Sequence, residues 1–326
     1  MLVNLHADAD AAHTERSLRG LGLWTQRLAD PEGQIRSLRI VAPSPPVSAD
    51  TLSGVPGVCS VLATQSGHPL VDAQAGRPVV VGNAQIGGGA PALIAGPCSA
   101  ESAEQVFAAA EIAAAAGAGI LRGGAYKPRT SPYSFRGHGP DALGWLREAA
   151  DRHGMALATE VMSEYDVERV GDVADLIQIG SRNMQNFALL RAVGRARQPI
   201  MLKRGRAATV EDWLLAAEHA LDAGVTQVVF CERGIRGFDP AMRNLLDLGA
   251  VALLKHVHGQ PVIVDPSHGC GRRDLVLPMA KAAFAAGADG VMVEVHPHSE
   301  TALSDGAQAL AAEELQVLAS QIGVQS

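Results

Sequence analysis

From about residue 92 onward, short apolar runs alternate with stretches of helical pattern, and this rhythm constrains the fold more than any other feature. The runs are continuous rather than polar at every second residue, which is typical of parallel strands buried on both faces. The helical stretches between them, such as 102–117 and 209–224, end in glycine. The apolar runs are ALIAG (92–96), GILR (119–122), ALATE (156–160), LIQIG (176–180), PIMLK (199–203), QVVFC (227–231), PVIVD (261–265) and GVMVE (290–294).

Eight strand–helix units in roughly 230 residues predict an α/β chain built as a (β/α)₈ TIM barrel. A doubly wound sheet is the alternative. However, no GxGxxG motif follows the first apolar run, and the pattern does not change halfway along the chain. We therefore predict the barrel.

The first 75 residues have a different pattern. Strand-like MLVNLH is followed by a helical stretch to Leu18, then by LWTQRLA, IRSLRIV, a Ser/Ala-rich segment and GVCSVLA. This order predicts a small α+β, ferredoxin-like domain of βαββαβ type over residues 1–75, with the catalytic barrel over 76–326. Residues 78–92 are expected to form a hairpin that closes the bottom of the barrel.

Composition excludes several classes of protein. The net charge is −7, with 47% hydrophobic and 19% charged residues, so a globular core is expected and a basic field for nucleic acid is not. There is no apolar stretch of about 18 residues and no basic-then-apolar leader. The four cysteines form no CxxC pair, so we expect a cytoplasmic protein with reduced thiols and no membrane segment.

Four potential metal ligands follow predicted strands. Cys98 follows the first strand, His268 the seventh and Glu294 ends the eighth, while Asp305 lies in the loop beyond it. Barrel active sites lie at the carboxyl ends of the strands, and the first, seventh and eighth strands are neighbours in a closed barrel. Individually these residues have ordinary alternatives, such as a buried thiol, a turn histidine or solvated carboxylates. Together they predict a site for Mn²⁺, with Fe²⁺, Co²⁺ or Zn²⁺ as alternatives, rather than Mg²⁺ or Ca²⁺.

Cationic side chains follow strands at the same end of the barrel. Lysine and arginine are costly at buried strand ends without anionic partners, and some are expected to pair with Glu160, Glu232 or Asp265. The cations still outnumber these acids, which predicts a pocket for phosphate and carboxylate groups. No P-loop or kinase signature points to nucleotide chemistry. The cations are Arg122, Lys127, Arg129, Arg182, Lys203 and Arg233.

Motifs spread from about residue 92 to 310 resemble the short-chain microbial 3-deoxy-D-arabino-heptulosonate 7-phosphate (DAHP) synthases. They are GPCSAES, RGGAYKPRTSPYSFRG, TEVM, QIGSRNMQNF, LKRG, CERGIR, VDPSH, GRRDLVLPMAKAAFAAGADGVMVEVHP and ALSDGAQ. The resemblance implies that Cys98, His268, Glu294 and Asp305 hold the metal. It also implies substrate contacts by Arg122, Lys127, Arg129, Thr130, Ser181, Arg182, Lys203 and Arg233.

The implied reaction joins phosphoenolpyruvate, erythrose 4-phosphate and water to give DAHP and phosphate, the first step of the shikimate pathway. In it the metal polarises the aldehyde as a Lewis acid. Lys127 and Glu160 are the candidates for proton delivery and water activation, and Asp265 is expected to orient its neighbours. With the ligand His268, these residues form the expected catalytic group.

Other readings remain open. The nearest is 3-deoxy-octulosonate 8-phosphate synthase chemistry on a five-carbon sugar phosphate, although KPRTSP favours the four-carbon aldehyde. The loop RGRAAT after Lys203, and Gly237 and Met242 in place of threonines, depart from the family pattern and leave a secondary-metabolic aldose open. A non-catalytic anion-binding barrel and a Schiff-base aldolase using Lys203 are further alternatives.

The resemblance extends to the first 75 residues, which match in length and pattern the ferredoxin-like domain that some of these synthases carry. There it responds to aromatic amino acids, so an aromatic amino-acid effector is an expectation here. The alternative is a packing module that sets the oligomeric state, and we expect a homo-oligomer, either a dimer or a tetramer.

Overall fold

The computed structural model describes residues 1–41, 43–63, 66–127, 131 and 133–324. It divides the chain into two units, Met1–Gly67 and His68–Ser326, which are described separately below. Among the described residues, no helix is both long and apolar enough to cross a membrane.

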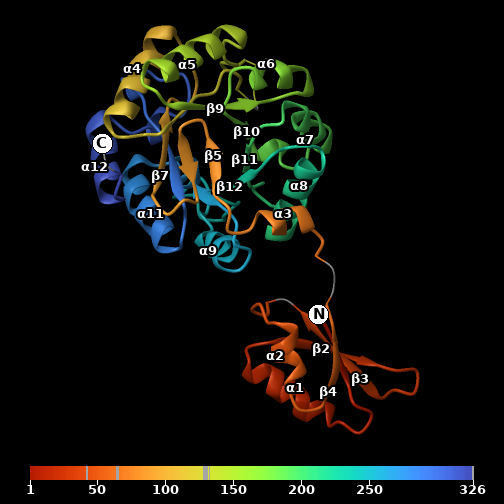
Figure 1. Ribbon diagram of the computed structural model, residues 1–326. Helices are drawn as coiled ribbons and strands as arrows, with labels where there is room; N and C mark the ends of the chain where they lie inside the picture. The colour runs from red at the N-terminus through yellow and green to blue at the C-terminus, as the bar shows by residue number, and fades with distance from the viewer. Residues whose placement is uncertain (42, 64–65, 128–130, 132, 325–326) are drawn as a thin grey trace. The chain divides into compact units, whose positions relative to one another are not determined.

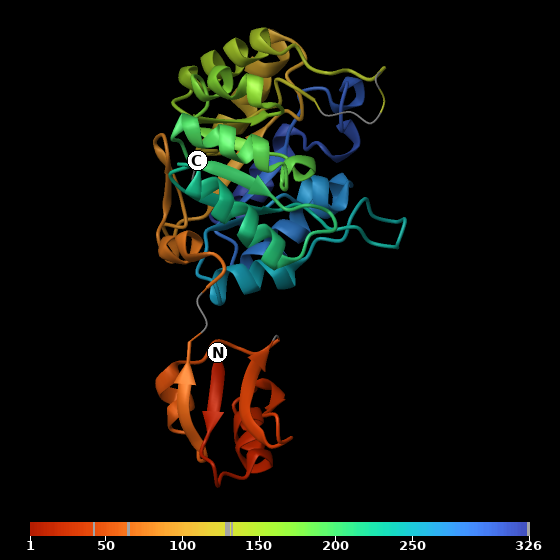
Figure 2. The ribbon, with the colours of Figure 1, turned by 90° about the vertical axis from the view of Figure 1, so that its right-hand side faces the viewer.

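The first unit is an antiparallel sheet with strand order β2-β3-β1-β4, joined in the βαββαβ order of a ferredoxin-like domain (Figure 2). Its first helix begins after Asp10, whose side chain accepts hydrogen bonds from the backbone N–H groups of Ala12 and His13. Leu18 and Leu38 are fully buried in its core. The elements are β1 (Leu2–Leu5), α1 (Ala11–Gly20), β2 (Trp24–Ala29), β3 (Ile35–Val41), α2 (Ala49–Ser53) and β4 (Val58–Leu62).

The second unit is a closed barrel of eight parallel strands, with helices in a ring outside it (Figure 1). This confirms the predicted TIM barrel. The strands are β7 (Ala92–Gly96), β8 (Ile120–Arg122), β9 (Ala156–Val161), β10 (Leu176–Ile179), β11 (Ile200–Lys203), β12 (Val228–Glu232), β13 (Val262–Val264) and β14 (Gly290–Glu294). The helices that follow them are α4 (Ala103–Ala115), α5 (Pro140–Arg152), α6 (Val167–Gly171), α7 (Phe187–Val193), α8 (Val210–Asp222), α9 (Leu248–His256), α11 (Arg273–Ala285) and α12 (Ala312–Gln321).

Shorter elements complete the barrel. A helix of one to two turns, α10 (Pro266–Cys270), follows β13. The expected hairpin is present as β5 (Val79–Val81) and β6 (Ala84–Ile86), and Val79, Val81 and Ile86 join the side chains that fill the barrel interior. Short 3₁₀ helices cover Glu164–Asp166, Ser181–Asn183, Gly194–Ala196, Ser299–Thr301 and Gly306–Gln308.

The division between the units falls earlier than the predicted boundary at residue 75. Helix α3 (Pro69–Gln74) belongs to the barrel unit, because the backbone N–H groups of Leu70 and Val71 donate to the Glu218 carboxylate on α8. Gln74 is buried and bonds to the backbone of Val228 on β12. The residues around position 75 therefore follow a helix of the barrel unit.

Side-chain alternation along the strands positions the functional end of the barrel. The apolar residues that face the interior include Ile94, Ile120, Ala158, Leu176, Met201, Cys231, Ile263 and Met292. Because a strand repeats its orientation every two residues, the residue two positions later also faces inward, now at the carboxyl end. At seven strands that position holds a buried polar side chain: Arg122, Glu160, Gln178, Lys203, Arg233, Asp265 and Glu294.

Candidate active site

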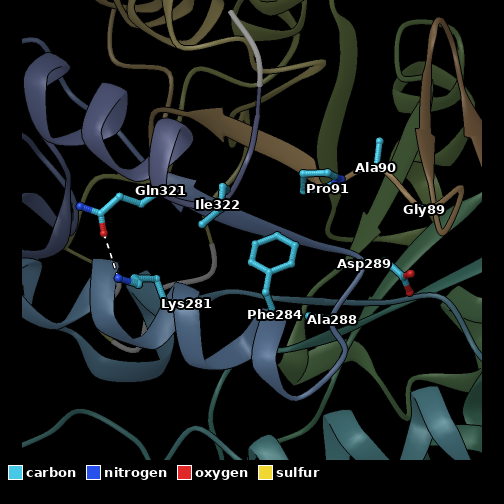
Figure 3. A pocket seen from close by; sticks show the side chains of 9 residues that line it. All are labelled: Gly89, Ala90, Pro91, Lys281, Phe284, Ala288, Asp289, Gln321 and Ile322. Carbon is cyan, nitrogen blue, oxygen red and sulfur yellow. Dashed lines mark hydrogen bonds between the residues drawn. The ribbon is translucent and has the colours of Figure 1, made fainter.

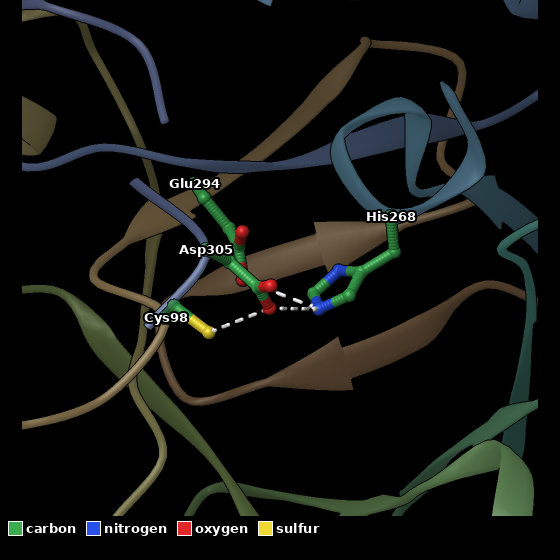
Figure 4. A group of neighbouring side chains, drawn as sticks. All are labelled: Cys98, His268, Glu294 and Asp305. Carbon is green, nitrogen blue, oxygen red and sulfur yellow. Dashed lines mark hydrogen bonds and ion pairs between the residues drawn. The ribbon is translucent and has the colours of Figure 1, made fainter. Parts of the chain in front are cut away.

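The four predicted metal ligands lie together at the carboxyl end of the barrel (Figure 4). One ligand atom from each of Cys98, His268, Glu294 and Asp305 lies within 4.8 Å of the others. His268 Nε2 is 3.3 Å from Glu294 Oε1 and 3.6 Å from Asp305 Oδ2, and Cys98 Sγ donates to Asp305 Oδ2 at 3.3 Å. A thiol sulfur, an imidazole nitrogen and carboxylate oxygens converge in a pattern that suits a divalent transition-metal ion.

His268 is held in the state that a metal ligand requires. Its Nδ1 lies 2.8 Å from Asp265 Oδ2, and its backbone N–H donates to Asp265 Oδ1 at 2.9 Å. With the ring proton on Nδ1, shared with this carboxylate, the Nε2 lone pair faces the other three residues. Burial lowers the pKa of His268, which favours the neutral imidazole.

Asp265 and Cys98 respond differently to burial. Burial opposes ionisation of Asp265, but His268 and Lys203 beside it hold the pKa of that carboxyl well below its usual range. For Cys98, burial and the neighbouring Glu294 raise the pKa of the thiol to about 11. Metal binding would therefore have to displace the thiol proton, and the Lys127 ammonium, which donates to Cys98 Sγ at 3.0 Å, favours the thiolate.

A cavity of about 390 Å³ opens above this cluster and is lined mainly by polar side chains. Two buried polar atoms at its wall, Arg122 Nε and Ser181 Oγ, have no hydrogen-bond partner among the described residues. Unpaired buried donors are costly, and an anionic ligand would satisfy them. The lining residues are Arg122, Lys127, Ser131, Ser134, Glu160, Gln178, Gly180, Ser181, Arg182, Asn183, Lys203, Arg233, Arg243, His268 and Asp305.

Some of the expected ion pairing is present within the site. Lys203 Nζ donates to Asp265 Oδ2 at 2.8 Å, and Arg122 Nη1 donates to Glu294 Oε1 at 3.2 Å and to the Pro97 carbonyl at 2.7 Å. Arg233 lines the cavity with no acidic partner within ion-pair distance among the described residues. The pocket therefore keeps cationic groups available for ligands.

Glu232 forms an ion pair, as expected, but outside the pocket. Glu232 is one residue before the inward-facing Arg233, so it faces the helices instead. There it accepts from Arg204 Nη1 at 3.1 Å, and Arg204 Nη1 also donates to Asp247 Oδ2 at 2.8 Å. These bonds hold the ends of β11 and β12 together on the side that faces the helices.

Most predicted site residues meet at this end of the barrel, directly at the cavity or just beneath it. Arg129 and Thr130 lie outside the described residues. The sequence-based prediction missed Gln178, whose side chain donates to Glu160 Oε2 at 3.1 Å, together with Arg243 and Gln308. The two-residue period of β10 could have identified Gln178, but Arg243 lies in a loop and Gln308 ends a short 3₁₀ helix, and neither segment has a period that predicts its position.

A second cavity, of about 330 Å³, lies at the opposite end of the strands (Figure 3). It is lined by Gly89–Pro91, which precede β7, by residues of α11 such as Phe284, and by Gln321 and Ile322 at the end of α12. Lys281 and Gln321 at its edge are hydrogen-bonded to each other at 3.1 Å. None of the predicted site residues that the structure describes lines it.

The fold and site define a TIM-barrel protein with a candidate metal centre beside a pocket lined by cationic side chains. The chain matches the DAHP synthetase I family over residues 68–325 and belongs to that family.

Relatives agree with this assignment over nearly the whole chain. A protein of Thermotoga maritima named phospho-2-dehydro-3-deoxyheptonate aldolase is 45% identical over 90% of this chain and 90% of its own length. The crystal structure of the Thermotoga maritima DAHP synthase superposes with a TM-score of 0.78 at 41% identity, covering 99% of this chain and 96% of that one. A 2-dehydro-3-deoxyphosphooctonate aldolase of Desulfosudis oleivorans is 31% identical over 74% of this chain and 92% of its own length.

Proposed function

We propose that this chain condenses phosphoenolpyruvate with erythrose 4-phosphate and water to give DAHP and phosphate. Membership of the DAHP synthetase I family supports this reaction. The observation that carries the proposal onto this chain is the convergence of Cys98, His268, Glu294 and Asp305 beneath a cation-lined pocket. Both substrates are anions, and such a pocket holds two anions that would otherwise repel each other.

We assign the cations of the pocket to phosphoenolpyruvate. Arg122, Lys127, Arg182, Lys203 and Arg233 line the cavity together with Ser181. Planar guanidinium groups match carboxylate and phosphate oxygens in pairs, whereas lysine supplies a compact charge. We assign Lys127, Arg129 and Thr130 to the path of the sugar phosphate, and Arg129 and Thr130 lie outside the described residues.

The reaction forms one carbon–carbon bond and one carbon–oxygen bond, and it breaks one carbon–oxygen bond. The methylene carbon of phosphoenolpyruvate attacks the aldehyde carbon, and the aldehyde oxygen takes a proton. Water adds to the carbon that bears the phosphate and gives up one proton. Cleavage of the bond between that carbon and the phosphate oxygen, with the proton of the added hydroxyl passing to the phosphate, then leaves the ketone and inorganic phosphate. A bound divalent ion would polarise the aldehyde carbonyl.

Two side chains at the cavity are our candidates for the proton transfers of this reaction, Glu160 and Lys127. Glu160 is buried at the cavity wall, and Gln178 holds its Oε2, which leaves Oε1 for an incoming water. Lys127 Nζ lies 3.0 Å from Cys98 Sγ, so it can deliver a proton near the candidate metal centre. Asp265 acts through its neighbours, because it orients Lys203 and His268.

The donor set fits a transition-metal ion, and we propose Mn²⁺ as the ion used, with Fe²⁺, Co²⁺ and Zn²⁺ as alternatives. One soft sulfur, one imidazole and two carboxylates lie between the preferences of zinc and those of manganese. A Schiff-base mechanism at Lys203 is disfavoured, because its ammonium is ion-paired with the fully buried Asp265.

The remaining proposals concern the setting of the reaction. We propose an aromatic amino acid as the effector of residues 1–67, a homo-oligomer as the assembly and the cytoplasm as the location. The cytoplasmic location is supported by four free cysteines, of which three are buried.

Comparison of two aldoses tests the proposed substrate. Phosphoenolpyruvate consumption should depend on erythrose 4-phosphate, with a kcat/KM well above that for arabinose 5-phosphate. The relatives named 2-dehydro-3-deoxyphosphooctonate aldolase make the five-carbon sugar the informative competitor. Preference for arabinose 5-phosphate would reject the proposed substrate while leaving the family assignment intact.

A further inference from the structure

Beyond the four candidate metal ligands, two side chains bind the carboxylates from the side away from the cluster. Arg243 Nη1 donates to Asp305 Oδ1 at 3.1 Å and to Gln308 Oε1 at 3.0 Å. Gln308 Nε2 donates to Glu294 Oε2 at 2.6 Å. A continuous chain of hydrogen bonds therefore runs from one carboxylate to the other through Arg243 and Gln308.

The two oxygens of each carboxylate are divided between different partners. Asp305 Oδ2 and Glu294 Oε1 face the cluster, at 3.6 Å and 3.3 Å from His268 Nε2. Asp305 Oδ1 and Glu294 Oε2 are the oxygens bonded to Arg243 and Gln308. This division leaves one oxygen of each carboxylate directed at the position where a metal would bind.

Arg243 is fixed by its backbone as well. Its N–H donates to the Cys270 carbonyl at 3.0 Å, and the next residue, Asn244, donates through its side chain to the His268 carbonyl at 2.8 Å. The segment is therefore bonded to α10, which carries His268. Arg243 links this helix to the loop that carries Asp305.

Asp305 benefits from such support because of its backbone. Its φ of 53° lies in the left-handed region, which residues other than glycine adopt uncommonly. Conformations of this kind persist when surrounding contacts hold them, and they are common at functional sites. Burial opposes ionisation of Asp305, but His268 and Arg243 together lower the pKa of its carboxyl.

We infer that Arg243 and Gln308 are positioning residues that orient the Asp305 and Glu294 carboxylates for metal binding. The inference rests on the proposed function, because it presupposes a metal at the cluster. An exposed Arg–Asp pair alone contributes little, and the Arg243 side chain is 42% exposed. The buried Gln308, 3% exposed and bonded to both Arg243 and Glu294, joins the two carboxylates into one unit.

Metal affinity of the full-length chain tests this inference without relying on turnover. Free Mn²⁺ would be measured by electron paramagnetic resonance during titration of the wild type, Arg243→Met, Gln308→Leu and the double variant. Loss of a group that orients a ligand typically weakens metal binding by about 10–100-fold, and we expect each single variant to fall in this range. Because the two residues act as a unit, the double variant should bind only slightly more weakly than the weaker single variant.

Two further variants separate positioning from general damage. Arg243→Lys keeps a donor and a charge, so it should recover part of the lost affinity. Arg272→Met is the matched control, because the Arg272 side chain is 49% exposed and is hydrogen-bonded to Asp274, so affinity should be unchanged. The Co²⁺ absorption spectrum should shift in Arg243→Met and Gln308→Leu but not in the control.

The outcomes distinguish this inference from the proposed function. If the wild type binds no metal, the metal centre itself is wrong. If the wild type binds Mn²⁺ and both single variants bind equally well, the positioning role is wrong. Losses that multiply in the double variant, or Arg243→Lys as weak as Arg243→Met, would equally overturn it. Because Arg243 is partly exposed, we expect its variants to fold. If Gln308→Leu does not fold, the Arg243 variants alone decide the test.

Discussion

Replacing Arg204 by methionine should destabilise the barrel far more than replacing its partner Glu232 by glutamine. Arg204→Met removes the cation beside Glu232, which is 0% exposed; among the described residues, Glu232 would then keep only the hydrogen bond from the Gly234 N–H at 2.6 Å. Breaking a buried ion pair in this way costs about 3–5 kcal/mol. Glu232→Gln leaves Arg204 bonded to Asp247 at 2.8 Å and to the Ala208 carbonyl at 3.1 Å, so the cost should be about 1.5–3 kcal/mol.

Thermal unfolding at several pH values measures both effects. A loss of 1 kcal/mol lowers Tm by roughly 2–4 °C in a domain of this size, so Arg204→Met should lower Tm by roughly 6–20 °C at pH 7. Burial raises the pKa of Glu232, and Arg204 opposes this increase, so its removal should raise that pKa further. A carboxyl whose folded pKa is above its unfolded value, about 4.3, destabilises the fold as pH rises between the two.

The deficit of Arg204→Met relative to wild type should therefore shrink as pH falls from 7 towards about 4.3. Glu232→Gln, which removes the titrating group, should show no such recovery. The double variant Arg204→Met/Glu232→Gln should lose less stability than the sum of the two single variants. Equal deficits for the two single variants, or a deficit of Arg204→Met that grows in acid, would refute the assignment of Glu232 as a buried charge neutralised by Arg204.

Four other predictions follow from the structure. Chelation should abolish turnover and Mn²⁺ should restore it, whereas full activity in metal-free protein would contradict the metal centre. Removal of residues 1–67 should leave a folded, active barrel without any aromatic amino-acid inhibition, which circular dichroism and kinetics would check. Gly96→Ala should cost about 3 kcal/mol or more in thermal unfolding, because its Cβ would lie 2.0 Å from the Arg122 carbonyl oxygen at φ 153°. Glu15 accepts a hydrogen bond from Arg27 at 2.6 Å, and this bond lowers the pKa of Glu15. Glu15→Gln should therefore speed amide hydrogen exchange in α1 above about pH 4.3, and this effect should disappear in strong acid. Unchanged exchange would contradict the prediction.

The sequence was sufficient for the barrel strands because continuous apolar runs leave few alternatives. The run 290–294 was predicted with the bounds that β14 has, and the run 227–231 was displaced by one residue from β12. The domain boundary was harder to predict from the sequence. Helix α3 belongs to the barrel because Gln74 and Leu70 bond to residues about 150 positions further along the chain. No local pattern reports such pairing.

The residues of the candidate site also fall into a group that the sequence predicts and a group that it does not. Residues at strand ends, such as Lys203 and Glu294, were predictable because the two-residue period directs them into the barrel. Arg243 and Gln308 were not, since their positions depend on hydrogen bonds between loops that follow different strands. The sequence indicated that acids would pair with cations, but the structure was needed to show that Glu232 does so outside the pocket.

The most direct test of the central claim is a ³¹P nuclear magnetic resonance time course with purified full-length protein. The mixture would contain equal concentrations of phosphoenolpyruvate and erythrose 4-phosphate, with Mn²⁺-loaded or metal-stripped enzyme. We predict that both substrate signals decay together in the loaded sample, that inorganic phosphate and one new sugar-phosphate signal appear in equal amounts, and that the stripped sample stays unchanged. Phosphate release without consumption of erythrose 4-phosphate, or identical time courses in the two samples, would contradict a metal-dependent condensation.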